Sequence, residues 1–515
     1  PKLTANRGVL SETERRTLSE NSVELAPTPR ERIFIQNFYL YLNMTEPEQG
    51  LYILCHKFDS AGKESRPSRI FYTVRKMYPA LEVQDGVPSF EMLTNPDNSG
   101  HMLIGGGLTD EQQKALLMFY MQNEPYASGL RKIADMTAAM DGADSLTKEA
   151  AYRLYEGIRS SSITRMETFE ECAFSHFAKY GLELEERKLY EINPADMGTV
   201  FHKALEMLSE RLAASGRNFS DMTDKERPEA VQKAVDDALE ACGIAYFDEN
   251  ETGRFLRRRI TDIMQRTVWA LGKQLEKGEF SPVDFERVFY GHYENTMIGG
   301  KIDRVDTAEK DGKLYVKIID YKSGRNDLSP DEIYAGLKLQ LMVYLQNTLE
   351  RAAKDNPGMG IVAAGAFYNR MDNPIVPYVS GASDGDYEKA LLKQLRPTGV
   401  VGLESAGLMD SWESSESLVI PAKRKKDGLL QADGHVYTDA QLKCLARFAA
   451  RKLAELEGRI NSGEIGASPY EGACEYCPYD AVCGFGRNGE RNFKKPEKIS
   501  KAPDMWIKFG YEEGG

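Results

Sequence analysis

The chain has 515 residues, of which 41% are hydrophobic and 28% are charged, and its formal net charge is −13. This is the composition of an ordinary soluble globular protein, and the length allows two or more domains because single cores stop growing near roughly 250–300 residues. No apolar run approaches the roughly 18 residues that cross a bilayer, and no secretory leader precedes the first predicted helix. We therefore expect no membrane contact and a cytoplasmic location.

The first 146 residues form two predicted regions. Residues 1–90 contain an amphipathic helix at "PRERIFIQNFYLYLNM" and a strand-like run at "GLYILC". The chain begins at Pro1 and not at a methionine, so we expect a part upstream of it. Residues 91–146 are predicted to be a helical connector, in which Asp110 is a plausible N-cap of "DEQQKALLMFYMQ".

Residues 147–515 form the third predicted region, in which helices and strands alternate as in an α/β domain. Helices are expected near 165–180, 196–214, 226–241, 253–277, 331–351 and 438–462, and strands near 282–290, 297–307, 313–321 and 361–370. We find no internal repeat in this region.

The stretch "IIDYKSG" at 318–324 ends an apolar strand with two charged residues. Side chains alternate along a strand, so Asp320 and Lys322 should project from one face and Tyr321 from the other. Alone, such a pair is more often a solvated surface pair than a catalytic site. Its meaning therefore depends on what lies near it.

The strand before it carries a second carboxylate in "GGKIDRVD" at 299–306. Asp311-Gly312 between the two strands is a strong hairpin signal, so the strands should turn back and bring Asp303 close to Asp320. A further acid, Glu286, lies on the preceding strand. Such hard oxygen ligands suit Mg²⁺ or Mn²⁺, beside which Lys322 could orient water or stabilise developing charge in phosphodiester hydrolysis.

These two stretches resemble the D…D-x-K core of the PD-(D/E)XK nucleases, in the RecB-like branch. That branch also has a histidine on an earlier helix, which His202 in "GTVFHKAL" matches, and a Q-x3-Y helix, which Gln340 and Tyr344 in "QLMVY" match. A lone helical histidine is usually a surface or satisfied residue, and a Gln–Tyr pair can simply be helical neighbours. Their occurrence together, in the expected order, favours the nuclease interpretation.

The resemblance implies a restriction-endonuclease-like α/β core, with a central mixed sheet flanked by helices. It further implies that a metal is held by His202, Asp303 and Asp320. The face on which Glu286 lies cannot be fixed from the sequence. The catalytic residues that the resemblance implies are Asp303, Asp320, Lys322, Gln340, Tyr344 and Glu286.

Four of the seven cysteines suggest a second metal site. Three of them, Cys474, Cys477 and Cys483, form C-x2-C-x5-C in a segment too short for a core, and Cys172 is the expected fourth ligand. Zinc is the alternative, but structural zinc sites usually pair two short C-x-x-C units, so we expect a [4Fe–4S] cluster bound by four thiolates. The remaining cysteines lie in apolar contexts typical of buried thiols; they are Cys55, Cys242 and Cys444.

The cysteine pattern resembles that of iron–sulfur RecB-like nucleases. The stretches "SSITRMETFEECAFSHFAKYGLEL" and "IPAKRKKDG" resemble the AddB (RexB) family, which forms part of bacterial AddAB helicase-nucleases. The resemblance implies a Mg-dependent deoxyribonuclease, an exonuclease that degrades the 5′-ended strand at double-strand DNA ends during recombinational repair. Its implied partners are an AddA-like helicase-nuclease subunit in a heterodimer, duplex DNA ends and single-stranded DNA, with the cluster as a staple across the domain.

The N-terminal region then corresponds to part of a UvrD-like helicase segment. Where such motors place arginines against the ATP γ-phosphate, this chain has Glu46, Pro47 and Glu48 after Met44 and Thr45. Acids there would repel the nucleotide, so the motor is expected to be silent. The expected domains are a vestigial helicase part at 1–90, a connector at 91–146 and a nuclease domain with the cluster at 147–515.

Two other functions stay open. One is a stand-alone iron–sulfur exonuclease of the CRISPR-adaptation type, against which the long N-terminal region argues. The other is a non-catalytic scaffold that binds DNA ends, against which intact Asp303, Asp320 and Lys322 argue. The net charge does not favour DNA binding, but "RFLRRR" at 254–259 and "KRKK" at 423–426 are local basic runs.

Overall fold

The structure is a computed structural model of the chain. It describes residues 18, 20–21, 27, 29–56, 66–83, 108–124, 126–132, 145–155, 160–185, 194–243, 251–293, 296–324, 326–377, 381, 383–431, 434–486 and 492–511. Within these ranges, no helix combines the length and apolar character that crossing a lipid bilayer requires.

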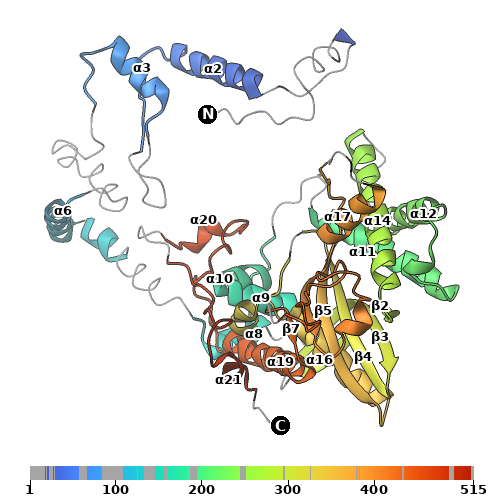
Figure 1. The fold of residues 1–515 in the computed structure, drawn as a ribbon. Helices are drawn as coiled ribbons and strands as arrows, with labels where there is room; N and C mark the ends of the chain where they lie inside the picture. The colour runs from blue at the N-terminus through green and yellow to red at the C-terminus, as the bar shows by residue number, and fades with distance from the viewer. Residues whose placement is uncertain are drawn as a thin grey trace. The chain divides into compact units, whose positions relative to one another are not determined.

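The chain divides into two compact units, Pro1–Gln122 and Asn123–Gly515. The described helices of the first unit are α2 (Pro29–Thr45), α3 (Arg69–Met77) and α6 (Asp110–Gln122). The helix predicted at the beginning of this unit forms as α2 (Figure 1). The strand predicted at "GLYILC" is wrong, because residues 51–56 have no strand hydrogen bonds, and Cys55 is exposed and not buried.

The second unit contains a seven-stranded mixed sheet with helices on both sides (Figure 1). Its strands are β1 (Ser160–Ser162), β2 (Ser281–Tyr293), β3 (Thr296–Lys310), β4 (Lys313–Lys322), β5 (Gly360–Arg370), β6 (Thr398–Gly402) and β7 (Val436–Tyr437). The order is β1-β3-β4-β5-β6-β7, with β2 paired to β3. β3 and β4 are antiparallel, whereas β4 and β5 are parallel.

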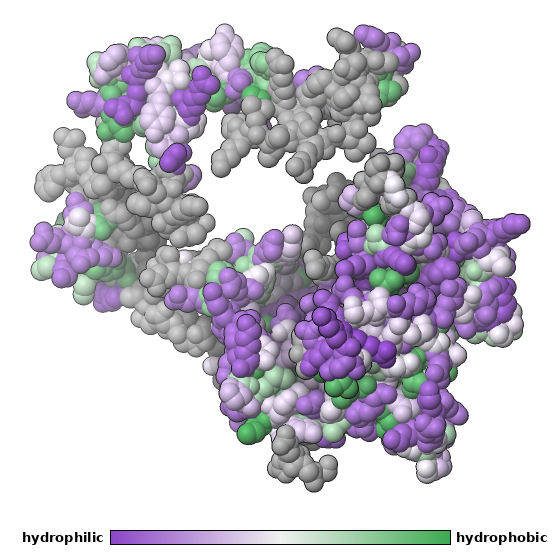
Figure 2. Space-filling model, viewed as in Figure 1, coloured by the Kyte–Doolittle hydropathy of each residue, from purple (hydrophilic) through white to green (hydrophobic). Residues whose placement is uncertain are grey.

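The helices of this unit connect and cover the strands. They are α8 (Lys148–Tyr155), α9 (Ile163–Glu171), α10 (Ala173–His176), the π-helix η1 (Phe177–Gly181), α11 (Pro194–Ala214), the 3₁₀-helix η2 (Phe219–Asp221), α12 (Arg227–Cys242), α14 (Glu251–Glu276), α15 (Pro330–Ala335), α16 (Gln340–Asp355), α17 (Asp384–Gln394), α18 (Ala406–Met409), α19 (Asp439–Asn461), α20 (Asp480–Cys483) and α21 (Met505–Phe509). On the face drawn in Figure 2, hydrophilic side chains predominate on this unit.

Two hydrophobic clusters fill the space on either side of the sheet. One joins α9, α16 and α19 to side chains such as Val316 and Ile318, and the other joins α11, α12 and α14 to Tyr315 and Ile319. These β4 residues alternate between the clusters, as expected for a strand buried on both faces. The predicted architecture, an α/β core with a central mixed sheet flanked by helices, is confirmed.

The hairpin between β3 and β4 forms where the sequence predicts it. Asp311 and Gly312 both have positive φ angles, 51° and 72°, as a tight hairpin turn requires. The register pairs Arg304 with Ile319, which brings Asp303 level with Asp320. The turn signal therefore determines which carboxylates meet.

Two predicted helices are interrupted. The helix expected over 331–351 is two helices, because α15 ends at Gly336 with a φ of 88° and α16 begins at Gln340. The helix expected over 165–180 breaks at Cys172, whose backbone is extended with a φ of −164°. Each break places a predicted site residue at a helix end.

Candidate active site

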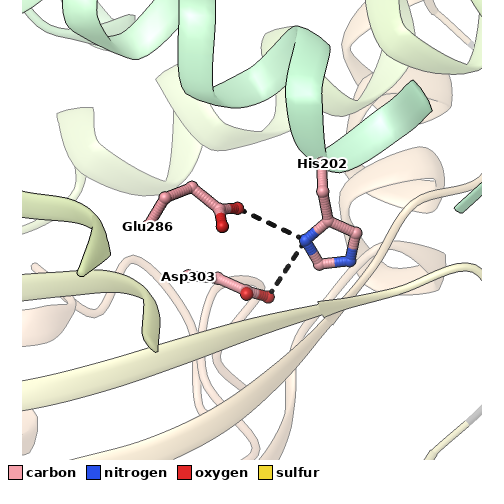
Figure 3. Close-up of side chains that lie close together, drawn as sticks. All are labelled: His202, Glu286 and Asp303. Atoms are coloured by element: carbon pink, nitrogen blue, oxygen red, sulfur yellow. Dashed lines mark ion pairs between the residues drawn. The ribbon is translucent and has the colours of Figure 1, made fainter. Parts of the chain in front are cut away.

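Three metal-ligating side chains meet where α11 lies over β2 and β3 (Figure 3). His202 Nδ1 lies 3.4 Å from Glu286 Oε1 and 3.4 Å from Asp303 Oδ2. One ligand atom from each residue lies within 4.8 Å of the other two. The structure thus brings His202 and Asp303 together as predicted, and it adds Glu286, whose face the sequence could not fix.

Glu286 reaches this position through an unusual backbone conformation. Its φ of 47° lies in the left-handed region, which costs a non-glycine residue on the order of 1–3 kcal/mol at such sites. The neighbouring pairs, Phe285 with Arg304 and Arg287 with Ile302, place it opposite Asp303 across β2 and β3. An ion pair of 2.7 Å with Lys301 holds the carboxylate there.

The charges of this cluster act strongly on the histidine. Burial alone would lower the pKa of His202, but the bonds and charges of Asp303 and Glu286 raise it to about 10. Both carboxyl side chains are nearly buried, with exposures of 8% and 7%. Asp303 Oδ2 also accepts a hydrogen bond of 2.7 Å from the backbone N–H of Tyr321, which ties β3 to β4.

The other predicted residues form a polar network beside this cluster. Lys322 Nζ lies 2.6 Å from Asp320 Oδ2 and donates to Gln340 Oε1 at 3.1 Å. Gln340 Nε2 lies 3.0 Å from both Asp320 Oδ1 and the Tyr344 hydroxyl. Asp320 and Lys322 therefore share a face, as predicted, whereas Tyr321 packs into the cluster on the other side of the sheet.

Asp320 is the link between the two groups of residues. Burial, and next the charge of Asp303, raise the pKa of Asp320 to about 7. Oδ2 of this buried carboxylate forms an ion pair of 2.6 Å with Lys322 Nζ and has no further partner among the described residues. An oxygen in this state is what a bound cation would satisfy.

Glu167 of α9 is a site residue that the sequence reasoning missed. Its Oε1 accepts hydrogen bonds from the backbone N–H groups of Leu339, at 2.6 Å, and Gln340, at 3.0 Å. Leu339 is the N-cap of α16 but has no side-chain cap of its own. A carboxylate from another helix thus satisfies the free donors at the beginning of the helix that carries Gln340 and Tyr344.

The four predicted cluster ligands line one small pocket. Cys172 comes from the end of α9, and Cys474, Cys477 and Cys483 come from the C-terminal segment. Backbone N–H groups of Phe174, Ser175 and Ser468 bond to the Cys172 sulfur, although burial still raises the pKa of its thiol. Among the described residues, no three cysteine sulfurs lie within 4.8 Å of one another, and no disulfide joins any of the seven cysteines.

Polar contacts also hold the cysteine segment to α9. Glu170 is nearly buried, pairs with Arg459 of α19 and accepts a hydrogen bond of 3.2 Å from the Tyr470 hydroxyl. The backbone N–H of Tyr470 donates to Glu171 O at 2.9 Å, and Lys494 Nζ lies 3.4 Å from Glu170 O. These bonds join residues that lie 289 to 324 positions apart in the sequence.

Comparison with known proteins assigns the fold to a family. Residues 160–484, more than half of the chain, match the PD-(D/E)XK nuclease superfamily. The chain belongs to this superfamily. The matched residues include every nuclease-site residue described above and the four predicted cluster cysteines.

Relatives extend the match beyond the nuclease superfamily region. The B subunit of an ATP-dependent helicase/deoxyribonuclease from Lachnoclostridium phytofermentans is 34% identical over 505 residues, covering 94% of this chain and 44% of the relative. Proteins of the same name from Thermoanaerobacter sp. and Clostridioides difficile are both 28% identical, covering 98% and 94% of this chain and 47% and 45% of the relatives. The chain thus spans slightly less than half the length of these curated relatives.

The two basic runs differ in this nuclease-superfamily chain. In "RFLRRR", Arg254 pairs with Glu251 and Arg257 lies 2.7 Å from Asp236, so part of its charge is neutralised. In "KRKK", the guanidinium of Arg424 lies over the Trp412 ring at 4.3 Å and Lys423 lies 3.6 Å from Glu416. The structure therefore pairs part of each run with acids or an aromatic ring of the second unit.

Proposed function

We propose that this chain is the metal-dependent DNA exonuclease part of a helicase-nuclease complex. The observation that carries the proposal is the continuity of the site: the His202–Glu286–Asp303 cluster adjoins the Asp320–Lys322 network within a PD-(D/E)XK fold. A non-catalytic scaffold would have no need to keep buried carboxylates and a strained Glu286 in this arrangement.

The donor set fits Mg²⁺ or Mn²⁺. Carboxylate oxygens suit both ions and an imidazole suits the softer Mn²⁺, and Asp320 offers an additional buried oxygen without a hydrogen bond. His202, Glu286, Asp303 and Asp320 would hold the cation. A divalent ion at this position supplies Lewis acidity toward a phosphodiester and lowers the pKa of water.

The chain's own residues have distinct tasks in the hydrolysis. Water adds to phosphorus as the bond to the leaving oxygen breaks, and that oxygen takes a proton. Lys322, 29% exposed, can donate from Nζ to the phosphate oxygens where negative charge develops. Gln340 bonds both Lys322 and Asp320, so it fixes the ammonium group relative to the carboxylate, and Tyr344 in turn holds Gln340.

The cysteine set supports a [4Fe–4S] cluster. A zinc ion with bonds near 2.3 Å would require three or four sulfurs about 3.8 Å apart in a tetrahedron, whereas no three cysteine sulfurs of the described residues lie within 4.8 Å of one another. Backbone N–H groups directed at the sulfurs of Cys172 and Cys483 are of the kind that tunes iron–sulfur sites. Hydrolysis transfers no electrons, so we propose a structural role, in which the cluster joins the C-terminal segment to α9.

The names of the relatives supply the wider setting. They are B subunits of helicase/deoxyribonucleases, so we propose an AddA-like partner and duplex DNA ends as the substrate, with the present chain cutting the 5′-ended strand in the cytoplasm. Residues 1–90 would belong to a silent helicase-like segment, in which exposed Glu46 and Glu48 follow α2. DNA-stimulated ATPase activity of the isolated intact protein would contradict that last assignment.

The test is a nuclease assay on the intact two-subunit complex with each DNA strand end-labelled. We expect cleavage of the 5′-ended strand to require Mg²⁺ or Mn²⁺, to stop with chelator, and to be lost in Asp320→Ala while unwinding continues. The loss follows because the metal and the Lys322 anchor disappear together, whereas contacts to the DNA backbone are kept. Degradation of both strands at the wild-type rate by this variant would refute the proposal.

A further inference from the structure

A second pocket opens beside the nuclease site, at the ends of β4 and β5. These parallel strands end next to each other at Lys322 and Arg370, which are register partners. The pocket has a volume of about 370 Å³, and Lys393, Arg396 and His435 also line it. Carboxyl ends of parallel strands are common ligand positions, because the following loops diverge there.

The pocket carries an excess of positive charge. Its lining has four cations, Lys322, Arg370, Lys393 and Arg396, and one acid, Asp327, and Arg370 lies 2.5 Å from Asp372. Lys393 and Arg396 share a single carboxylate with Lys423, which lies outside the lining, since Glu416 is 2.8 Å from Lys393, 3.2 Å from Arg396 and 3.6 Å from Lys423. Arg396 also donates to Ser417 O at 2.9 Å, which fixes its guanidinium group. One carboxylate cannot neutralise three cations, so an anion bound here would be attracted without first having to break every ion pair.

A larger cavity in the second unit has the opposite character. It has a volume of about 1220 Å³ and lies between the cysteine segment, η1 and the beginning of α16. Its charged lining residues are Glu171, Glu183, Glu185, Glu332, Glu471, Lys179 and Lys338. A polyanion would be repelled from this cavity, so size alone does not identify the DNA path.

We propose that the basic pocket binds the phosphodiester backbone of the DNA strand next to the bond that is cut. Lys322 lines this pocket and also contacts Asp320 and Gln340, so the pocket and the nuclease centre are continuous. The Lys322 ammonium group lies 5.7 Å from the centre of the Tyr368 ring, which forms another part of the wall. This inference rests on the proposed nuclease function and adds a phosphate subsite to it.

The test changes Lys393, one of the cations that line the pocket. Lys393 has a side chain that is 55% exposed and paired with Glu416, so Lys393→Gln and Lys393→Glu should fold normally. Lys310→Gln is the matched control, since Lys310 is 48% exposed and lies 3.2 Å from a single acid, Glu279. It lies at the other end of the β3–β4 hairpin, about 30 Å from Lys322 along the strand.

Affinity for a fluorescent single-stranded oligonucleotide is measured with the intact complex, with Ca²⁺ replacing Mg²⁺ so that DNA stays uncut. We expect Lys393→Gln to weaken binding about three- to tenfold and Lys393→Glu to weaken it further. The slope of log K against log salt should become shallower by about 0.7 for each lost phosphate contact. Lys310→Gln should match the wild type in both quantities.

Three results would refute the proposal that the basic pocket binds DNA. If wild-type complex cuts DNA but Lys393→Glu keeps the wild-type affinity and salt slope, the pocket does not bind DNA, and the proposed nuclease function stands. If Lys393→Glu weakens assembly of the complex while its salt slope is unchanged, the pocket is a protein contact. If wild-type complex cuts neither strand with any divalent metal, the proposed function fails and the subsite fails with it.

Discussion

The nuclease centre and the cysteine segment are held in place by different means. Glu286, Asp303 and Asp320 come from three neighbouring strands, so the register of the sheet positions them. The four cysteines come from one helix end and a segment with little regular structure, about 300 residues later in the chain. The comparison suggests that changes in the centre should affect chemistry and changes at the cysteines should affect stability.

The largest effect should follow from Asp303→Asn. Asparagine still accepts from the Tyr321 N–H, but it removes one of the three carboxylates, Glu286, Asp303 and Asp320, at the proposed metal site. We expect strand cleavage to fall by about 10⁴-fold, or about 5.5 kcal/mol, and Mn²⁺ affinity measured by calorimetry to fall with it. The melting temperature should stay constant or rise, because repulsion with Asp320 is relieved. If the variant had a much lower melting temperature than the wild type, the nuclease centre would also contribute to stability, contrary to the comparison.

Cys477→Ala should have the reverse profile. A cluster shared by Cys172 and Cys483 closes a loop of about 300 residues, which by the chain-entropy model of a cross-link stabilises the fold by roughly 5 kcal/mol. We expect the brown colour of anaerobically purified protein to fade and residues near α9 to become sensitive to protease. Cys242→Ala, at a half-buried thiol outside the pocket, is the control. Colourless wild-type protein with one bound zinc would refute the iron–sulfur assignment. The proposal that a metal joins the C-terminal segment to α9 would still stand.

Much of the nuclease centre could be predicted because local signals encode it. The Asp311-Gly312 turn and the alternation along β4 together place Asp303 beside Asp320 and Lys322. Glu286 could not be placed, because its left-handed backbone depends on packing and no local pattern encodes it. The class of fold followed from helices and strands with clear periodicity, whereas β1, β6 and β7 were missed because they are only two to five residues long.

As the pH falls, the region around Cys172 should lose stability before the nuclease centre does. His176 follows Cys172 closely, is fully buried and accepts a hydrogen bond of 3.0 Å from Arg165 Nε. Burial, and next the charge of Arg165, lower the pKa of His176 to about 3 from 6.5. The unfolded state therefore binds a proton that the folded state does not, so stability falls as pH drops from about 6.5 toward 3.

His176→Gln keeps an acceptor for Arg165 but cannot be protonated. We expect the variant to lose less stability than the wild type between pH 6.5 and pH 4, by up to about 3 kcal/mol, with equal stability slopes above pH 7. Melting temperatures measured at half-unit pH steps give the comparison. Identical acid profiles for the two proteins would show that other groups control the loss.

The smallest effect concerns the contact that joins the two regions. Glu167 lies on α9, five residues before Cys172, and caps α16 at Gln340, so the helix that ends at the cysteine site also positions the nuclease network. The only sequence signal for this contact is a missing N-cap residue. No Ser, Thr, Asp or Asn stands immediately before "QLMVY", so another residue must cap the helix.

Glu167→Ala should cost about 1–2 kcal/mol at this helix end and let Gln340 shift, which lowers kcat about tenfold with KM and Mn²⁺ affinity unchanged. Glu167→Gln retains an acceptor oxygen for both N–H groups and should restore most of the rate. Glu171→Ala, on the same helix but exposed and without a cap, is the matched control. A fully inactive Glu167→Gln with weak metal binding would mean that the carboxylate itself is a ligand, and the two regions would then share chemistry and not only a mechanical contact.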